Sequence, residues 1–288
     1  MSQVIVIDGR IVDAASATIS VLDRGLLYGD GLFEVVRTWN GRVVELAAHL
    51  DRLEESARFL RLPVDRASLV RHVELALHDA SQRDATSQRD AKGTSDWRIR
   101  IVVTRGPGAL SMPVASAGPG HDIVIVEPLG VIADAMSLAV VEWSLPRRAG
   151  RGHKTLAYLD HVIAREMARE LGADDAVRLD ADGRVAEGGT CNVFAVRANV
   201  VHASDAGGVL PGVTAARVRD LCRRSDIPMV VGPIDLQAFL TADEVFVTSA
   251  VRGVVAVTRL ISDGERALPV GVVTRRIRAA YAGEMAAL

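Results

Sequence analysis

The chain has 288 residues of ordinary globular composition, 49% hydrophobic and 24% charged, and is long enough for two domains. Its formal net charge of −2 excludes the basic excess of a nucleic-acid binder, and no charge run points to a membrane surface. The two cysteines lack metal-ligand spacing, and we find neither a signal-like N-terminus nor a membrane-length apolar run. These features predict a cytoplasmic protein without a metal site.

The first half of the chain is expected to form hairpins and two helices. Asp8-Gly9 and Asn40-Gly41 are dipeptides that fit tight hairpin turns. Apolar residues recur at helical spacing in AAHLDRLEESARFL and again after Ser68. The polar segment 81–96, with its near-duplicate SQRDA, is expected to be a loop or a frayed helix end. In chain order we expect strands around Val4–Ile11, a strand Phe33–Thr38, helices Leu50–Leu60 and Ser68–His78, and strands Arg98–Arg105 and Ile123–Val126.

The second half mixes strands and helices without a regular βαβ period, which favours an α+β fold over a doubly wound α/β fold. A boundary near Pro128 would give a smaller N-terminal domain of residues 1–129 and a larger C-terminal domain of residues 130–288. In chain order we expect strand 138–143, helix 155–171, strands 176–179, 192–196 and 200–201, helix 214–224, strands 245–247 and 254–257, and a C-terminal helix.

Lys154 stands where a loop rich in glycine and cations meets the predicted helix 155–171. A lysine at a helix N-terminus among other cations is expected to have a lowered pKa, because its charged form is disfavoured. A neutral amine is what a Schiff-base lysine needs. Taken alone, Lys154 fits an exposed lysine in a basic loop at least as well.

Three further features offer groups that a phosphorylated pyridine cofactor needs. Glu187 precedes two glycines, which let backbone approach a ligand, and a carboxylate is the partner expected for a protonated pyridine nitrogen. The LPGVT run opens a helix whose first N–H groups, near Val213 and Thr214, suit a phosphate. Arg52 offers a guanidinium to a phosphate. The ordinary alternatives are a hairpin turn for Glu187, a threonine-capped helix start for LPGVT and a solvated charge for Arg52.

Read together and in order, these blocks resemble the class IV aminotransferases, the fold-type IV pyridoxal-phosphate enzymes. The resemblance covers nearly the whole chain and is carried by DRGLLYGDGLFEVVRTWNG, HLDRLEESA, VVTRG, the region after Lys154, VAEGGTCNVF, LPGVT and ADEVFVTSA. It implies a two-domain α+β fold like that of D-amino-acid aminotransferase, with the Schiff-base lysine in the C-terminal domain. It also implies a homodimer.

The resemblance implies a role for each matching residue. Lys154 would carry pyridoxal 5′-phosphate as an internal aldimine and shuttle the substrate proton, and Glu187 would face the pyridine nitrogen. Arg52 and the backbone of Val213 and Thr214 would hold the phosphate. The other cofactor-side positions are Thr190, Cys191, Asn192, Ser249 and Ala250. Family members often carry a hydroxyl where this chain has Ala250, so only its backbone N–H would serve there.

The residues on the substrate side do not agree on one substrate. Phe33 stands where D-amino-acid aminotransferases have a tyrosine, and the loop GPGALSMPV lacks their arginine and histidine. Tyr28 and Arg100 resemble positions that branched-chain enzymes use around the substrate carboxylate, although Arg100 fits a solvent-facing strand residue equally well. The block TSAVRGVVAV is closer to lyase-type members, and its Arg252 would meet a substrate carboxylate.

The expected reaction is therefore transfer of an amino group between an amino acid or amine and a 2-oxo acid, both small molecules. The alternatives are 4-amino-4-deoxychorismate lyase, in which pyruvate is eliminated, and, less favoured, an (R)-selective amine transaminase. One site architecture supports all three outcomes. The joint presence of Lys154, Glu187 and Arg52 disfavours a non-catalytic relative.

Overall fold

The structure is a computed structural model that describes residues 3–86, 96–109, 117–143 and 152–287. It divides the chain into two compact units. The first unit comprises the chain up to Gly130 together with Lys154–Tyr158, and the second comprises Val131–His153 and Leu159–Ala287. Within the described ranges, no helix is long and apolar enough to cross a membrane.

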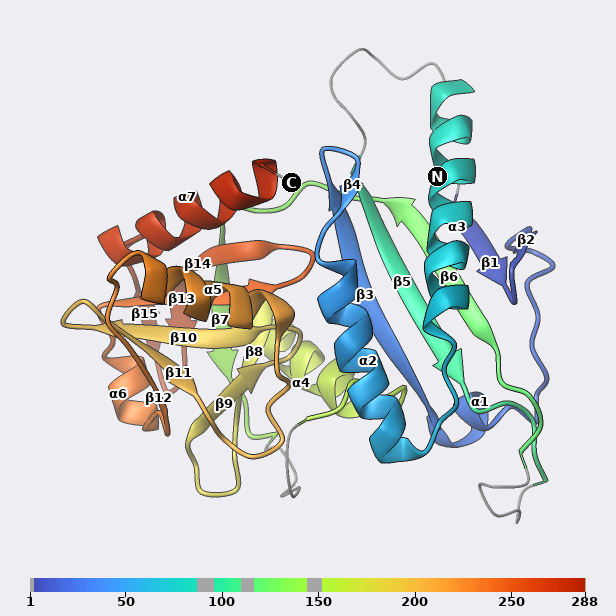
Figure 1. The fold of residues 1–288 in the computed structure, drawn as a ribbon. Helices are drawn as coiled ribbons and strands as arrows, with labels where there is room; N and C mark the ends of the chain where they lie inside the picture. The colour runs from blue at the N-terminus through green and yellow to red at the C-terminus, as the bar shows by residue number, and fades with distance from the viewer. Residues whose placement is uncertain (1–2, 87–95, 110–116, 144–151, 288) are drawn as a thin grey trace. The chain divides into compact units, whose positions relative to one another are not determined.

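The first unit is a six-stranded antiparallel sheet in the order β2-β1-β6-β5-β3-β4. The helices α2 and α3 cover one face of this sheet (Figure 1). The elements are β1 Val4–Ile7, β2 Arg10–Val12, α1 Arg24–Tyr28, β3 Gly31–Trp39, β4 Arg42–Val43, α2 Leu46–Leu60, α3 Arg66–Thr86, β5 Trp97–Thr104 and β6 Asp122–Pro128. Both predicted hairpins are present, at Asp8-Gly9 and at Asn40-Gly41.

The two faces of this sheet carry different side chains. In β5, Ile99 and Ile101 alternate with Arg100 and are buried in the core beneath the helices. In β3, the same period of two places Leu32 in that core and turns Phe33 to the opposite face, which it shares with Arg100. The chemically interesting side chains of β3 and β5 therefore lie on the face that α2 and α3 leave uncovered.

Helix α3 is longer than the predicted Ser68–His78, because the first copy of SQRDA continues it to Thr86. An ion pair between Arg83 and Asp79, one helical turn apart at 2.6 Å, supports this extension. The second copy of SQRDA, at residues 87–91, lies outside the described residues. So do residues 110–114 of the GPGALSMPV loop and the cations at 147, 148 and 151.

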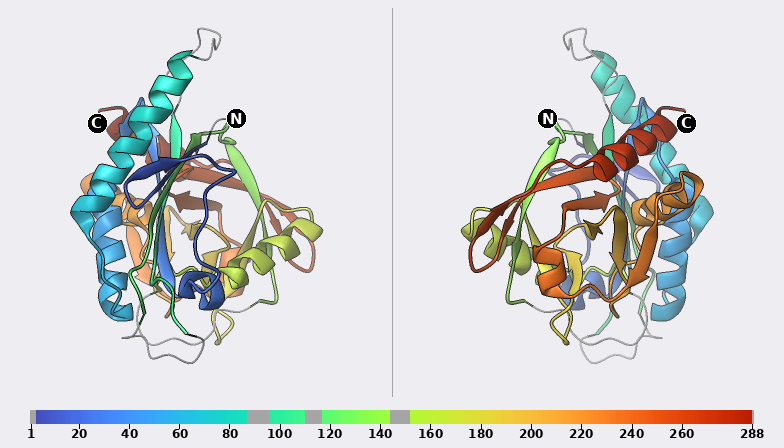
Figure 2. Two further views of the ribbon diagram at one scale, coloured as in Figure 1. Left: turned by 90° about the vertical axis from the view of Figure 1, so that its right-hand side faces the viewer. Right: turned by 90° about the vertical axis from the view of Figure 1, so that its left-hand side faces the viewer.

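The second unit contains a nine-stranded mixed sheet with the path β12-β11-β10-β13-β14-β7-β8-β9 and with β15 paired to β14. Strand β9 also contacts β10 and β11, so the sheet curls toward itself. Helices α5 and α7 pack side by side on its outer face (Figure 2), and α4 packs against β7 and β8. The elements are β7 Ala135–Val140, α4 Leu159–Glu170, β8 Asp175–Leu179, β9 Val185–Gly188, β10 Asn192–Arg197, β11 Val200–Ser204, α5 Val213–Arg224, β12 Met229–Gly232, α6 Leu236–Leu240, β13 Glu244–Ser249, β14 Gly253–Ile261, β15 Glu265–Ala267 and α7 Val272–Ala286.

Helix α4 begins at Leu159, so the prediction that it starts at Thr155 is wrong. The preceding residues are extended instead, because Thr155 forms a β-bridge with Leu32 of β3 and the Leu156 N–H donates to the Gly31 carbonyl at 3.0 Å. This pairing also differs from the expectation that Lys154 belongs to the C-terminal domain. Lys154–Tyr158 pack as part of the first unit.

Candidate active site

Lys154 lies beside two aromatic rings of the first unit. Its backbone carbonyl accepts a hydrogen bond from the Phe33 N–H at 3.0 Å, which fixes the residue next to β3. Its Nζ lies 4.6 Å from the centre of the Phe33 ring and 5.5 Å from the centre of the Tyr158 ring. The two rings pack edge to face, 5.1 Å apart. The amine is therefore positioned by β-pairing and aromatic packing, and the predicted helix-terminus environment does not apply to it.

Arg100 joins the same cluster. Its guanidinium carbon lies 4.1 Å from the centre of the Phe33 ring, and the side chain is half-buried. Burial lowers the pKa of Arg100, and Tyr158 partly offsets that effect. A guanidinium remains charged at neutral pH even so. Arg100 is thus not a solvent-facing strand residue, and the structure brings it together with Lys154 and Phe33.

Two glycines of the YGDG run allow the Lys154–Tyr158 segment to come close. Gly29 has a φ of +64°, and a Cβ there would lie 2.7 Å from the backbone nitrogen of Ala157. A Cβ on Gly31 would lie 2.5 Å from the Val103 carbonyl oxygen and 2.6 Å from Leu156 Cδ1. Side chains at either position would push the lysine-bearing segment away from β3, so this part of the motif has a steric reason.

Two other predicted residues of the first unit lie apart from this cluster. Tyr28 is exposed at the end of α1, and its ring centre lies 4.9 Å from the guanidinium of Arg24. Arg52 of α2 is 9% exposed and lies on the helix-covered face of β3, where it donates to Glu34. Burial alone would raise the pKa of Glu34, but hydrogen bonds from His49 and the adjacent Arg52 outweigh it and lower that pKa to about 2. The phosphate role of Arg52 stays a prediction.

In the second unit, Glu187 and Asn192 both hold the loop that leads into α5. The carboxylate of Glu187 is buried and accepts a hydrogen bond from the Leu210 N–H at 3.0 Å. The Asn192 amide donates to the Leu210 carbonyl, also at 3.0 Å. A Cβ on Gly212 would lie 2.0 Å from the Asn192 amide oxygen, which explains the glycine of LPGVT.

Helix α5 begins with N–H groups that suit an anion. Its N-cap is Gly212, and among the described residues no side chain caps the helix start. Thr214 lies inside the helix and is buried, so the alternative in which this threonine is the N-cap is wrong. The first helical hydrogen bond runs from the Ala216 N–H to the Gly212 carbonyl, so the N–H groups of Val213 and Thr214 precede it.

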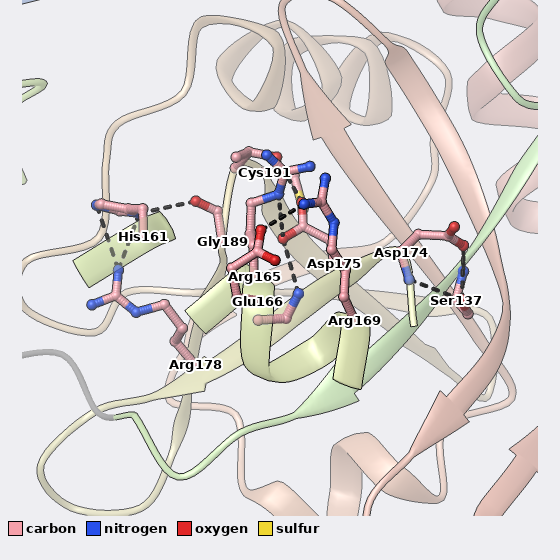
Figure 3. Close-up of polar contacts among 12 residues, drawn as sticks. Ser137, His161, Arg165, Glu166, Arg169, Asp174, Asp175, Arg178, Gly189 and Cys191 are labelled. Carbon is pink, nitrogen blue, oxygen red and sulfur yellow. Dashed lines mark hydrogen bonds and ion pairs between the residues drawn. The ribbon is translucent and has the colours of Figure 1, made fainter. Parts of the chain in front are cut away.

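Three predicted site residues converge on Asp175, which is fully buried at the start of β8 (Figure 3). The Thr190 hydroxyl donates to its carboxylate at 2.6 Å, and Arg252 Nη1 lies 3.7 Å from the same oxygen and 3.3 Å from Thr190 Oγ1. Burial, together with the charge of Asp175, raises the pKa of the Cys191 thiol far above its usual value. The side chains of Thr190 and Cys191 therefore build this network, and Cys191 is not a reactive thiol.

Ser249 and Ala250 lie at the end of β13 and in the turn that follows. The Ser249 hydroxyl accepts a hydrogen bond from the Arg252 N–H at 3.2 Å, so it closes this turn. Their predicted place on the phosphate side stays a prediction.

Sequence reasoning missed Tyr158, Asp175 and Arg178. Tyr158 was concealed by the wrong helix start, since in a helix it would have pointed away from the face of Lys154. Asp175 and Arg178 are charged residues within the strand-like run DAVRL, and such a charge in a buried strand was a signal that could have been followed. Arg178 has 0% exposure.

These residues fit pyridoxal phosphate. Lys154 offers a primary amine among aromatic rings, and Glu187 offers a buried carboxylate. The start of α5, without a side-chain cap, offers backbone donors for a phosphate.

Comparison with known proteins agrees with this arrangement. The fold is that of the fold-type IV transaminases. A branched-chain aminotransferase of Thermoproteus uzoniensis, crystallised with norvaline, aligns with a TM-score of 0.82 at 28% identity over 98% of this chain and 94% of its own. A second branched-chain amino acid aminotransferase, from the organism abbreviated T.th. and complexed with N-(5'-phosphopyridoxyl)-L-glutamate, aligns with a TM-score of 0.82 at 26% identity over 98% of this chain and 93% of its own.

Residues 31–260 match the model of the family described as amino-transferase class IV, and the chain belongs to that family. It is a pyridoxal-phosphate-dependent aminotransferase. A putative branched-chain-amino-acid aminotransferase of Methanocaldococcus jannaschii is 31% identical over 281 residues, which cover 95% of this chain and 93% of that protein.

Proposed function

We propose that this aminotransferase exchanges an amino group between an aliphatic, branched-chain L-amino acid and a 2-oxo acid, and that Lys154 is its covalent cofactor residue. The observation that carries the proposal is the cluster of Lys154, Arg100, Phe33 and Tyr158. One guanidinium beside the amine suits one substrate carboxylate, and two aromatic rings suit an apolar side chain. The branched-chain aminotransferases among its relatives support the same substrate class.

When bound, pyridoxal phosphate supplies a carbonyl that reacts with amines and a ring that withdraws electrons from the substrate carbon. Lys154 would bind the cofactor covalently, and its released amine would take up and return the proton of that carbon. Glu187 would face the ring nitrogen with its carboxylate. Arg52 and the N–H groups of Val213 and Thr214 would hold the phosphate. Arg100 would orient the substrate through its carboxylate.

We also propose that the working unit is a homodimer. Val21, Leu22, Leu26 and Leu27 are all exposed large apolar side chains in and just before α1. Clustered exposed apolar residues are typical of a surface that another chain covers. Both cysteines are free thiols, which supports placement in the reducing cytoplasm.

The decisive experiment mixes the cofactor-loaded protein with single amino acids and follows the absorbance of the lysine-bound cofactor, expected at about 410–420 nm. We expect L-leucine, L-isoleucine and L-valine to deplete this band, and D-alanine to leave it in place. A Lys154→Ala variant should lack the band altogether. A wild-type protein that stays colourless with added cofactor would overturn the assignment of Lys154. Release of pyruvate from aminodeoxychorismate, with no depletion by any amino acid, would replace the transaminase by the lyase.

A further inference from the structure

Arg178, in the middle of β8, is a fully buried arginine. A guanidinium removed from water costs free energy unless an anion and hydrogen-bond acceptors surround it. Its Nη1 lies 3.1 Å from Nδ1 of His161 on α4, and that Nδ1 also lies 2.9 Å from the Gly189 carbonyl oxygen (Figure 3). One ring nitrogen cannot accept from Arg178 and donate to Gly189 at once, and an imidazole carries no negative charge. The balancing anion has to come from another residue.

The register of the β8–β9 pair identifies that anion. Arg178 lies directly opposite Glu187, so the two side chains leave the sheet on the same face with their Cβ atoms about 5 Å apart. The register then shifts, and Leu179 pairs with Val185. Ala186 is thus the extra residue of a β-bulge, which lets Val185 enter the core of the unit while Glu187 stays on the face of Arg178.

The other charged groups near this pair are engaged elsewhere. Asp175, also on β8, is an odd number of residues away from Arg178 and points to the opposite face. There it accepts from Thr190 and lies within 4.0 Å of Arg165 of α4 and of Arg252. On α4, Glu166 and Arg169 form an exposed ion pair with each other. Of these groups, Glu187 is the buried carboxylate on the face of Arg178.

We propose that Arg178 is a positioning residue that pairs with Glu187, keeps it ionised and thereby sets the charge presented to the cofactor ring. This inference rests on the proposed role of Glu187. The chemistry follows from Coulomb's law, because a buried cation makes it harder for nearby groups to hold a proton. With Arg178 in place, Glu187 presents a partly neutralised carboxylate. Without Arg178, the carboxylate would favour protonation of the cofactor.

The first test follows the absorbance of the lysine-bound cofactor against pH. In Arg178→Met, the pH midpoint of its colour change should rise by about one unit, the effect of removing one charge at roughly 8 Å in a protein interior. Arg178→Lys, which retains the charge, should stay close to wild type. The control is Arg184→Met, which removes an exposed arginine from the same β8–β9 hairpin and should not change the midpoint. An unchanged midpoint in Arg178→Met, or an equal rise in Arg178→Lys, would overturn the proposal.

A second test needs no cofactor and covers the case in which Arg178→Met folds poorly. Thermal unfolding of the cofactor-free protein is compared for Arg178→Met, Glu187→Gln and the double variant. Each single change leaves one buried charge without its partner, whereas the double change removes both. The double variant should therefore melt at or above the lower of the two single variants, and not at the sum of both losses. Additive losses would show that the two residues do not interact.

The two tests separate the outcomes. A coupled double variant in a protein that never binds the cofactor would leave the ion pair standing and end the proposed role of Glu187. A cofactor-binding protein with additive losses and an unchanged midpoint would end the role of Arg178 alone.

Discussion

Arg52 of α2 donates two hydrogen bonds to Glu34 of β3, from Nε to Oε1 at 2.7 Å and from Nη2 to Oε2 at 2.5 Å. His49 lies 2.9 Å from the second oxygen, and Glu34 has no exposed surface. The guanidinium is thereby oriented by a rigid, buried carboxylate. A cation fixed in this way loses little freedom when it binds an anion such as a phosphate.

The Glu34 network predicts acid sensitivity. Its folded-state pKa of about 2 lies below the ordinary value of 4.5, so its stabilisation is complete above pH 4.5 and is lost as the pH falls toward 2. Denaturant unfolding should show a fall in the free energy of unfolding of the wild type across this range, and a smaller fall in Glu34→Gln. The matched control is Glu54→Gln, a partly exposed position on α2. Equal pH slopes for wild type and Glu34→Gln would refute this prediction.

Gly29→Ala tests the close approach of the lysine-bearing segment. Gly41→Ala is its control, since Gly41 also has a positive φ but nothing lies within 4 Å of the added Cβ. The control should lose roughly 1–2 kcal/mol of stability from backbone strain alone. Gly29→Ala should lose about 1–3 kcal/mol more, because the Cβ meets the Ala157 backbone. Equal losses, measured by denaturant unfolding, would mean that the approach is not tight.

Arg100→Met should weaken substrate binding. Removal of a charge-assisted hydrogen bond to the substrate carboxylate is expected to raise KM for the amino acid about 10- to 100-fold. Arg98→Met is the control, because Arg98 lies on the same face of β5 but is exposed and pairs with Glu127. Steady-state kinetics check the prediction. A similar KM in both variants would move the carboxylate site away from Arg100.

Arg252→Ala separates a substrate role from a structural one. Arg252 and Arg165 both lie near Asp175, at 3.7 and 3.9 Å, so either substitution removes one cation from that buried carboxylate. If Arg252 also meets a substrate carboxylate, its variant alone should raise KM, by about 10-fold or more. Comparable melting temperatures with a KM increase confined to Arg252→Ala are expected. An unchanged KM would restrict Arg252 to the Asp175 network.

Much of this protein is encoded in local sequence. Asp8-Gly9 and Asn40-Gly41 form the hairpins they predict, and the helical period of AAHLDRLEESARFL is helix α2. The ordered blocks from DRGLLYGDG to ADEVFVTSA were enough to indicate the family and its cofactor, because each block is a short run whose chemistry does not depend on distant residues.

The tertiary structure decided what depends on distant pairing. Local pattern predicts a helix right after Lys154, but Thr155 pairs with β3 more than a hundred residues earlier in the chain, and that bridge keeps the segment extended. The partners of Arg100 and Arg178 likewise follow from strand register, since a side chain's face and its opposite residue are set by hydrogen bonding between strands. Lys154 as the reactive residue came from sequence alone. The rings around it, and the arginine opposite Glu187, required the fold.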